Sequence, residues 1–301
     1  MRRWLEFAAA WLALKTLGIL PRPLARATGA MLTRMALFFR PRLRRAAHFN
    51  LRMAFPDMPE AERHRILNAS VRQVGWMAGE FAHFPRYSRE NIERVIVPDG
   101  FENFDSAFRR GKGVLYLTAH ASAWELSSFA QSLYGYPLHF VMRPIDNQRV
   151  DALVNRYRCL SGNTPIEKNK SARPVLQVLR AGECVGVLID HNTSLEEGVF
   201  VDFFGVPACT TSGLARIALR TDAAVVPTFV FWDEQMRKYH LRFEPALELA
   251  RTGDEQRDIV ENTARFTRAI EEYVRRHPDQ WLWVHKRWRT RPPGEKPLNP
   301  F

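Results

Sequence analysis

The sequence predicts an α/β fold: a mixed, largely parallel central sheet flanked by helices, preceded by an N-terminal helical membrane-associated region. Two observations support this prediction. From residue 95 onward, short apolar runs alternate with helical patterns, which is typical of βαβ units and a parallel sheet. The residues before it carry helical spacing without strand-like runs. The chain has 301 residues, 46% hydrophobic and 25% charged, enough for a sizeable buried core.

Residues 1–40 are expected to form helices broken at Pro21 and Pro23. The run 4–20 is apolar but contains two charges, whereas about 20 clean apolar residues are needed to cross a bilayer. M-R-R opens it as in a signal peptide, yet no small-residue cleavage site follows. A second apolar stretch, 25–39, precedes R-P-R-L-R-R. We expect these helices in or on the membrane, their basic flanks on anionic headgroups. Buried core helices are the alternative.

A helical region over 41–94 should follow. Residues 42–56 resemble one amphipathic helix ending before Pro56, and 59–84 carry apolar residues at helical spacing. The third region is an α/β core over 95–301 with a Pro-rich tail that we expect to be extended.

Within this core the patterns predict alternating strands and helices. Strands are expected at 95–97, 114–118, 138–142, 184–190, 223–231 and 239–244, and helices at 101–110, 124–133, 147–160, 174–181, 211–220 and 256–276. Pro227 suggests an edge strand or a strand end. The segment from 198 to 210 is expected to be an apolar loop.

The formal net charge of +12 calls for a partner: nucleic acid, an anionic membrane or an acidic substrate. The arginines are spread through membrane-like helices and no recognition motif is present, which argues against nucleic acid. Three widely separated cysteines indicate a reduced cytosolic setting.

The segment T-A-H-A-S-A-W-E, residues 118–125, is the strongest candidate for chemistry. His120 follows a buried strand, and Glu125 falls one turn inside the next helix, with Ser122 as its expected N-cap. Glu125 can then hold one imidazole nitrogen and leave the other free as a general base for a hydroxyl. A histidine at a strand end is, however, more often structural.

Polar residues follow two more predicted strands. Arg143 can grip a phosphate or carboxylate, or simply pair with Asp146. Asp190, His191 and Asn192 follow the strand at 184–190 as site residues, unless Asp190 merely caps a helix. A metal bound by His120, Asp190 and His191 is a weaker alternative, because metalloenzyme spacing is absent. No G-x-S-x-G elbow supports a serine esterase.

The apolar loop G-V-F-V-D-F-F-G-V-P-A-C-T-T offers a further hypothesis. Phe200, Phe203 and Phe204 could line an acyl channel or belong to the core.

Together these blocks resemble the lysophospholipid acyltransferase superfamily, in particular the bacterial lipid A biosynthesis (lauroyl/myristoyl) acyltransferase branch. The resemblance covers almost the whole chain. It rests on H-F-N-L-R-M-A-F-P-D, A-H-A-S-A-W-E-L, M-R-P-I-D-N, V-L-I-D-H-N with G-V-F-V-D-F-F-G-V-P-A-C-T-T, A-A-V-V-P, and W-L-W-V-H-K-R-W.

By this resemblance the H-x4-E block implies that His120 and Glu125 are catalytic. The second and third blocks imply substrate-binding roles for a further set of residues: Arg143, Asn147, Asp190, Gly205 and Thr210. Pro207 in the third block and Pro227 in the fourth also match the family's motifs. Two departures stand out. His191 stands where the family usually has Gln, and A-S-A-W replaces the usual F-G-N-W inside the first block. Both leave room for a different acceptor, such as another glycolipid or a lysophospholipid.

The resemblance implies that the protein transfers a fatty acyl chain to a hydroxyl of a glycolipid. The donor would be a thioester of acyl carrier protein or coenzyme A. The acceptor would be a molecule such as a precursor of lipid A, which is a component of lipopolysaccharide. His120 would act as base, Glu125 would orient it, and Arg143 would hold a phosphate or the oxyanion. Neither a cofactor nor a metal is expected. The expected location is the cytoplasmic face of the bacterial inner membrane, on its anionic surface. Transfer to a lysophospholipid or another lipid, a lipid or thioester hydrolase, and a non-catalytic membrane protein are the alternatives.

Overall fold

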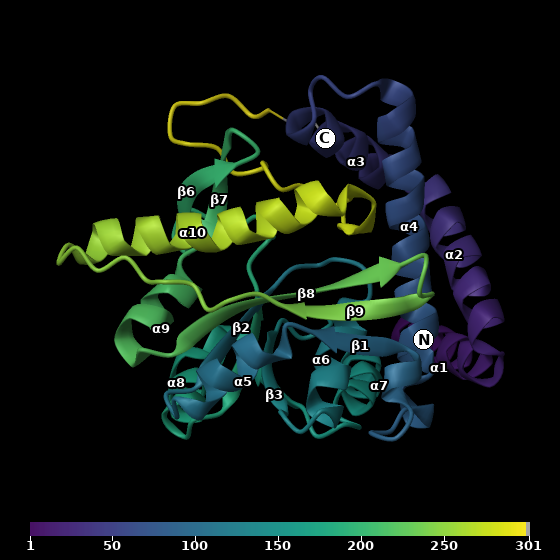
Figure 1. Cartoon of the computed structure of the whole chain (residues 1–301). Helices are drawn as coiled ribbons and strands as arrows, with labels where there is room; N and C mark the ends of the chain where they lie inside the picture. The colour runs from purple at the N-terminus through teal and green to yellow at the C-terminus, as the bar shows by residue number, and fades with distance from the viewer. Residues whose placement is uncertain (299–301) are drawn as a thin grey trace.

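The N-terminal helices form a layer against one side of the α/β body in the computed structural model, which describes residues 1–298 (Figure 1). They are α1 (Arg2–Ile19), α2 (Arg22–Phe38), α3 (Pro41–Ala54) and α4 (Glu60–Ala82), with the break at Pro21 as predicted. A Cβ on Gly29 would lie 2.2 Å from the carbonyl oxygen of Gly75, so α2 and α4 can cross this closely only with glycine there. None of the helices in the described chain has the length and apolar character needed to cross a membrane.

The central sheet confirms the predicted fold class. Within residues 1–298 it has seven strands in the order β1-β9-β8-β2-β5-β3-β4, and every neighbouring pair is parallel except β8 with β9. The strands are β1 (Ile96–Asp99), β2 (Val114–Thr118), β3 (Leu138–Met142), β4 (Thr164–Glu167), β5 (Cys184–Leu188), β8 (Ala224–Asp233) and β9 (Lys238–Phe243). The sequence did not predict β4.

Helices cover both faces of this sheet. They are α5 (Phe101–Arg109), α6 (Trp124–Leu133), α7 (Gln148–Arg158), α8 (Ala172–Arg180), α9 (Gly213–Thr221) and α10 (Glu255–Arg276), with short 3₁₀ turns η1 (Phe84–Arg86), η2 (Ile92–Arg94), η3 (Lys168–Lys170) and η4 (Pro278–Gln280). α10 lies on the opposite side of the sheet from α5 and α6 (Figure 1). Alternate residues of β2 enter two apolar clusters: Leu115 and Leu117 join α8, α9 and α10, while Val114 and Tyr116 join α5 and α6.

The predicted apolar loop is instead an antiparallel hairpin of β6 (Gly198–Phe203) and β7 (Val206–Thr211). Its turn residues, Phe204 at φ 57° and Gly205 at φ 76°, both lie in the left-handed region that a tight two-residue hairpin turn requires. Phe203 and Phe204 are buried against Trp281 and Trp283. They belong to the core, which removes the acyl-channel hypothesis for both.

Pro227 lies inside β8 rather than at a sheet edge or a strand end. β8 pairs with β2 as far as Pro227 and with β9 from Thr228 onward, so the proline stands where one ladder gives way to the other. The tail beyond Arg289 contains neither helix nor strand as far as residue 298, and its last residues, 299–301, lie outside the described residues.

Candidate active site

A cavity of about 590 Å³ opens at the carboxyl ends of β2, β3 and β5. The pairing of β3 with β5 ends at Phe140 and Gly186, although both strands continue, so the cavity reaches between them and is lined from both faces of the sheet. One side is polar and includes His120, Glu125, Arg158 and Ser128. The other is an apolar arm, formed by Val141, Val175, Val187, Ile189, Leu214 and Ile217. This is where parallel α/β sheets bind ligands.

Asp190, not Glu125, orients the imidazole of His120. The Nδ1 atom of His120 lies 2.8 Å from Oδ1 of Asp190, and the backbone N–H of His120 donates to Oδ2 at 2.9 Å. Trp281 donates its Nε1–H to the same Oδ2 at 2.9 Å. Because a carboxylate only accepts, Nδ1 carries the proton in the neutral ring, and Nε2 keeps the lone pair that a general base needs.

Burial alone would raise the pKa of Asp190, which has a fully buried side chain. The positive charge that His120 can carry and the hydrogen bonds from His120 instead hold it well below its usual range. The carboxylate is therefore ionised at neutral pH and stabilises positive charge on His120.

The prediction that Glu125 holds the imidazole is wrong in this geometry. Glu125 forms a two-pronged ion pair with Arg158 of α7, at 2.9 Å (Nε–Oε2) and 2.5 Å (Nη2–Oε1). Both side chains are mostly buried and line the cavity beside His120. Glu125 also lies in the first turn of α6, where a negative charge is favoured by the helix dipole. It thus remains in the site, partnered by an arginine.

Ser122 is not the N-cap of α6. That position belongs to Ala123, and no side chain caps the helix. Ser122 has φ 47°, and its backbone N–H donates to the carbonyl of Gln280 at 2.6 Å. This unusual backbone turns the chain sharply between His120 and α6.

Arg143 and Asn147, predicted together from one motif, separate in the structure. Arg143 lines the cavity and pairs with Asp146 at 3.3 Å, with both side chains largely exposed, so this pair contributes little stability. Asn147 caps α7 by accepting from the N–H of Arg149, and its amide donates to the carbonyl of Arg3 and to Glu6 of α1. It does not line the cavity, and its role is to dock α1 beside the cavity rim.

Two further predicted binding residues, Gly205 and Thr210, do not line the cavity. Gly205 forms the exposed hairpin turn, away from the cavity lining. Thr210 is buried, and its hydroxyl accepts from Arg287 at 2.5 Å. Arg287 is itself fully buried, and it donates to the carbonyls of Cys209 and His191.

The C-terminal segment completes the site, which sequence reasoning from single motifs missed. Ala121 pairs with Trp281 in an isolated bridge, and Leu282 donates to the carbonyl of His120 at 3.0 Å. His285 lines the cavity from the same segment. The only signal was W-L-W-V-H-K-R-W itself, whose aromatic density is unusual for a tail.

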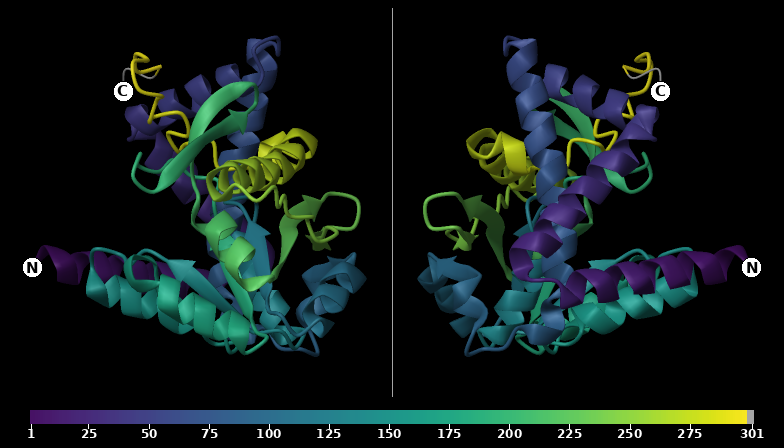
Figure 2. Two further views of the ribbon diagram at one scale, coloured as in Figure 1. Left: turned by 90° about the vertical axis from the view of Figure 1, so that its left-hand side faces the viewer. Right: turned by 90° about the vertical axis from the view of Figure 1, so that its right-hand side faces the viewer.

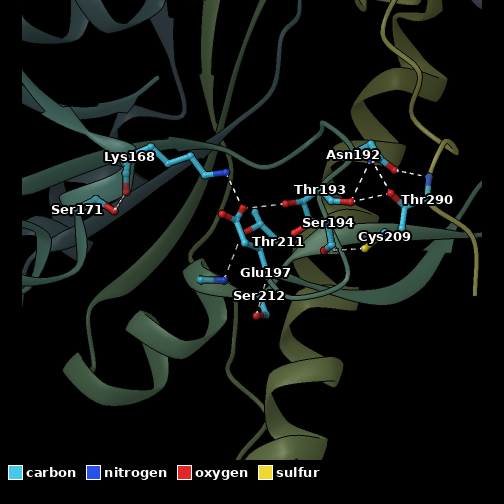
Figure 3. Close-up of polar contacts among 11 residues, drawn as sticks. Lys168, Ser171, Asn192, Thr193, Ser194, Glu197, Cys209, Thr211, Ser212 and Thr290 are labelled. Carbon is cyan, nitrogen blue, oxygen red and sulfur yellow. Dashed lines mark hydrogen bonds and ion pairs between the residues drawn. The ribbon is translucent and has the colours of Figure 1, made fainter. Parts of the chain in front are cut away.

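Lys168, which lines the cavity next to α8, forms an ion pair with Glu197 at 2.7 Å (Figure 3). Glu197 also accepts from Thr193 at 3.0 Å. These contacts tie η3 to the loop that precedes β6.

The suggested metal group, His120, Asp190 and His191, has ligand atoms within 4.8 Å of one another. Two imidazoles that share a metal must aim their lone pairs at one point. The rings of His120 and His191 are instead parallel to within 6°, with centroids 3.7 Å apart, so their lone pairs lie in two separate parallel planes and do not meet at one point. The geometry fits a stacked general base rather than a metal site.

Comparison with known proteins identifies the family of this chain. The family model described as "Bacterial lipid A biosynthesis acyltransferase" matches residues 1–290. A lipid A biosynthesis acyltransferase of Haemophilus influenzae is 30% identical over 84% of this chain and 77% of its own length. A lipid A biosynthesis lauroyltransferase of Escherichia coli is 28% identical over 97% of this chain and 92% of its own length. A lipid A biosynthesis myristoyltransferase of the same organism is 25% identical over 84% of this chain and 77% of its own length.

Proposed function

The chain belongs to the bacterial lipid A biosynthesis acyltransferase family, and we propose that it moves a fatty acyl chain from a thioester donor to a hydroxyl of a lipid A precursor, with His120 as general base. The observation that carries this proposal is the imidazole of His120. Its Nδ1 is held by the buried carboxylate of Asp190, which leaves Nε2 available at a cavity with an apolar arm.

The reaction needs one proton acceptor and one proton donor. Nε2 of His120 takes the proton of the acceptor hydroxyl while the oxygen attacks the thioester carbonyl carbon. The carbon–oxygen bond forms, the tetrahedral intermediate collapses, and the carbon–sulfur bond breaks. The imidazolium then returns its proton to the departing thiolate, so the enzyme is regenerated.

Two arginines supply positive charge at the cavity. Arg158 is fixed by Glu125 in the polar wall, and this pair would position the acceptor or the donor carbonyl beside His120. Arg143 is mostly exposed at the rim, and its guanidinium can reach an acceptor phosphate. Glu125 thereby acts on the substrate through Arg158 and not on the imidazole.

The acyl chain would occupy the apolar arm. This arm lies between β5, α8 and α9, it is lined by branched aliphatic side chains, and it starts next to His120. A cavity of about 590 Å³ falls within the usual range for small-molecule sites, roughly 300–1,000 Å³. The donor would be a thioester of acyl carrier protein or coenzyme A, since both are acidic and the protein is strongly basic.

The helices α1 and α2 would rest on the membrane. Their outward apolar side chains are exposed, among them Trp4, Leu12, Ile19, Met35 and Phe38. Figure 2 shows α1 extending to one side with the N-terminus at its outer end. Exposed arginines follow in α3, whose charge suits the anionic inner-membrane surface at the cytoplasmic face. Because Asn147 fixes α1 beside the cavity rim, a lipid acceptor would enter from this surface.

Lipid mass spectrometry of cells that lack the protein tests the proposal. We expect wild type to restore an acyl chain to a lipid A species, and His120→Ala to fail. His139→Ala is the matched control, because that histidine pairs with the surface residue Glu183. Unchanged lipids, or full complementation by His120→Ala, would reject the function. A shifted lysophospholipid, or free fatty acid released by purified protein, would instead identify the alternative acceptor or a hydrolase.

A further inference from the structure

Three imidazole rings lie face to face at the site. His120 and His191 stack with centroids 3.7 Å apart and planes within 6°, and His191 and His285 stack at 3.7 Å and 8°. Trp124 meets the His120 ring edge-on at 5.4 Å. The three histidines come from three segments far apart in the chain, after β2, after β5 and beyond α10, so no local turn imposes the stack.

The outer ring of the stack is pinned to the backbone. Asn192 donates its backbone N–H to Nε2 of His285 at 2.9 Å, so this nitrogen accepts and Nδ1 carries the proton. Thr290 holds the side chain of Asn192 in turn (Figure 3). The side-chain NH₂ of Asn192 donates to the hydroxyl of Thr290, and the backbone N–H of Thr290 donates to the side-chain oxygen of Asn192, each at 2.9 Å. The middle ring is therefore clamped between a fixed partner and His120.

The middle ring, His191, interacts with its neighbours mainly through the faces of its imidazole. Within the described chain, no hydrogen bond is made by the side chain of His191, and its buried Nε2 has no partner. Burying an imidazole nitrogen without a hydrogen bond costs stability, and an apolar residue would avoid this cost. Position 191 is also where the chain departs from the usual Gln of the family it resembles.

The middle ring, His191, and the ring behind it, His285, stay neutral at pH 7. Burial lowers the pKa of His191 to about 3 and that of His285 to about 4, and the nearby positive charge of Arg287 acts in the same direction. The charged or titratable groups around His120 are Asp190 on Nδ1, His191 on one ring face, His285 and Arg287 behind it, and the Glu125–Arg158 pair across the cavity. When His120 takes a proton, the resulting cation faces a neutral ring.

We propose that His191 is a positioning residue: its ring, backed by His285, keeps the imidazole of His120 aligned with Asp190 and stabilises the imidazolium that forms during acyl transfer. A cation over an aromatic face is attracted by the ring's electrons, and the attraction strengthens when water is excluded. The inference rests on the proposed role of His120 as base.

The test compares His191→Phe, which keeps an aromatic face, with His191→Leu, which fills the space without one. Acyl transfer by the purified full-length chain is followed against pH, with thermal unfolding to confirm that both variants fold. For His191→Leu we expect kcat to fall about threefold to tenfold and the acid limb of kcat/KM to move about half a pH unit lower, with His191→Phe close to wild type. KM should change little in either variant.

A second readout does not depend on activity. The Cε1–H resonance of His120 should show an upfield ring-current shift in wild type and His191→Phe, and lose it in His191→Leu. If Leu and Phe variants behave alike in rate, pH limb and chemical shift, the stacking role is rejected. His120→Ala is assayed in parallel. If His120→Ala is active, the proposed function itself is overturned. If His120→Ala is inactive but His191→Leu behaves like wild type, only the stacking inference is overturned.

Discussion

Asp190→Asn is the sharpest perturbation of the site. The Asp190 carboxylate accepts from the His120 backbone N–H and Trp281 Nε1 on Oδ2, and from His120 Nδ1 on Oδ1. An asparagine can keep both Oδ2 bonds by placing its oxygen there. Its NH₂ group then faces Nδ1, which must become an acceptor. The imidazole switches tautomer, Nε2 carries the proton, and the base is lost while the backbone stays in place.

The magnitude follows from these contacts. Hydrogen bonds to a charged group are each worth about 1.5–3 kcal/mol, and the neutral amide retains two of them in weaker form, so the free energy of unfolding should fall by about 2–3 kcal/mol. The rate should fall far more, because the same substitution in a buried Asp–His pair costs on the order of 10⁴ in kcat through the wrong tautomer.

The assay is acyl transfer from a thioester to a lipid A precursor, with product quantified by mass spectrometry, beside thermal unfolding. Asp258→Asn is the matched control: that buried carboxylate accepts from the backbone and hydroxyl of Thr252, at the start of α10. It should lose stability without losing kcat. A kcat for Asp190→Asn within tenfold of wild type would refute the reasoning that Asp190 orients the base.

The pH dependence of stability gives an independent check on Asp190. Its pKa is lower in the folded protein than its ordinary value of 3.8. The stabilising contribution is therefore fully present above about pH 4 and disappears as the pH falls through the folded value. Wild type and Asp190→Asn should converge in melting temperature in acid, and a constant difference would contradict the assignment.

Three further predictions concern the cavity wall, its apolar arm and the N-terminal helices. Glu125→Gln leaves Arg158 without its carboxylate, so kcat should fall about 10²-fold; a fall no larger than for Glu183→Gln on the surface would contradict this role. Ile217→Phe fills the apolar arm, so competition between thioesters should shift toward shorter acyl chains by about tenfold or more, and an unchanged product profile would remove the acyl chain from this arm. Leu12→Asp with Phe38→Asp should weaken sedimentation with anionic vesicles, whereas Met236→Asp, at an exposed position in the β8–β9 turn, should not.

The partner of His120 could not be found by pairing residues close in sequence. In the parallel β2–β5 pair, Thr118 lies opposite Leu188. Residues two positions beyond each strand therefore also lie side by side, and these are His120 and Asp190. The sequence carried the needed pattern, a polar residue two positions after each of two buried strands, but strand neighbours are set by tertiary packing. Glu125 was instead nearest along the chain, and its partner Arg158 comes from α7.

The other differences between the predicted and the observed secondary structure also have local causes. Periodicity predicted the helices and buried strands well, because their apolar residues repeat at the spacing of the element. It missed β4, a four-residue edge strand with a proline, which pairs with β3 alone. It also missed the β6–β7 hairpin, whose turn pairs Gly205 with a phenylalanine at positive φ rather than with Asn or Asp.

The N-terminal helices are part of the support of the site and not a separable anchor. Asn50 of α3 donates to the carbonyl of Trp283 at 2.7 Å, and Ser70 of α4 donates to that of Trp281. These buried polar contacts hold the segment that brings Trp281 to Asp190 and His285 to the ring stack.

The connection continues outward to the proposed membrane face. The guanidinium of Arg26 in α2 contacts the rings of both Trp76 and Trp232, at 3.6 and 3.9 Å from their centroids, and Arg22 pairs with the fully buried Glu80 of α4. Replacing Arg22 by alanine would leave this buried carboxylate without its nearest charged partner, a strongly destabilising change. The proposed membrane face and the carboxylate of Asp190 are thus joined through α4 and the C-terminal segment, so under the proposed function the same packing that builds the site would set the height of the cavity above the membrane.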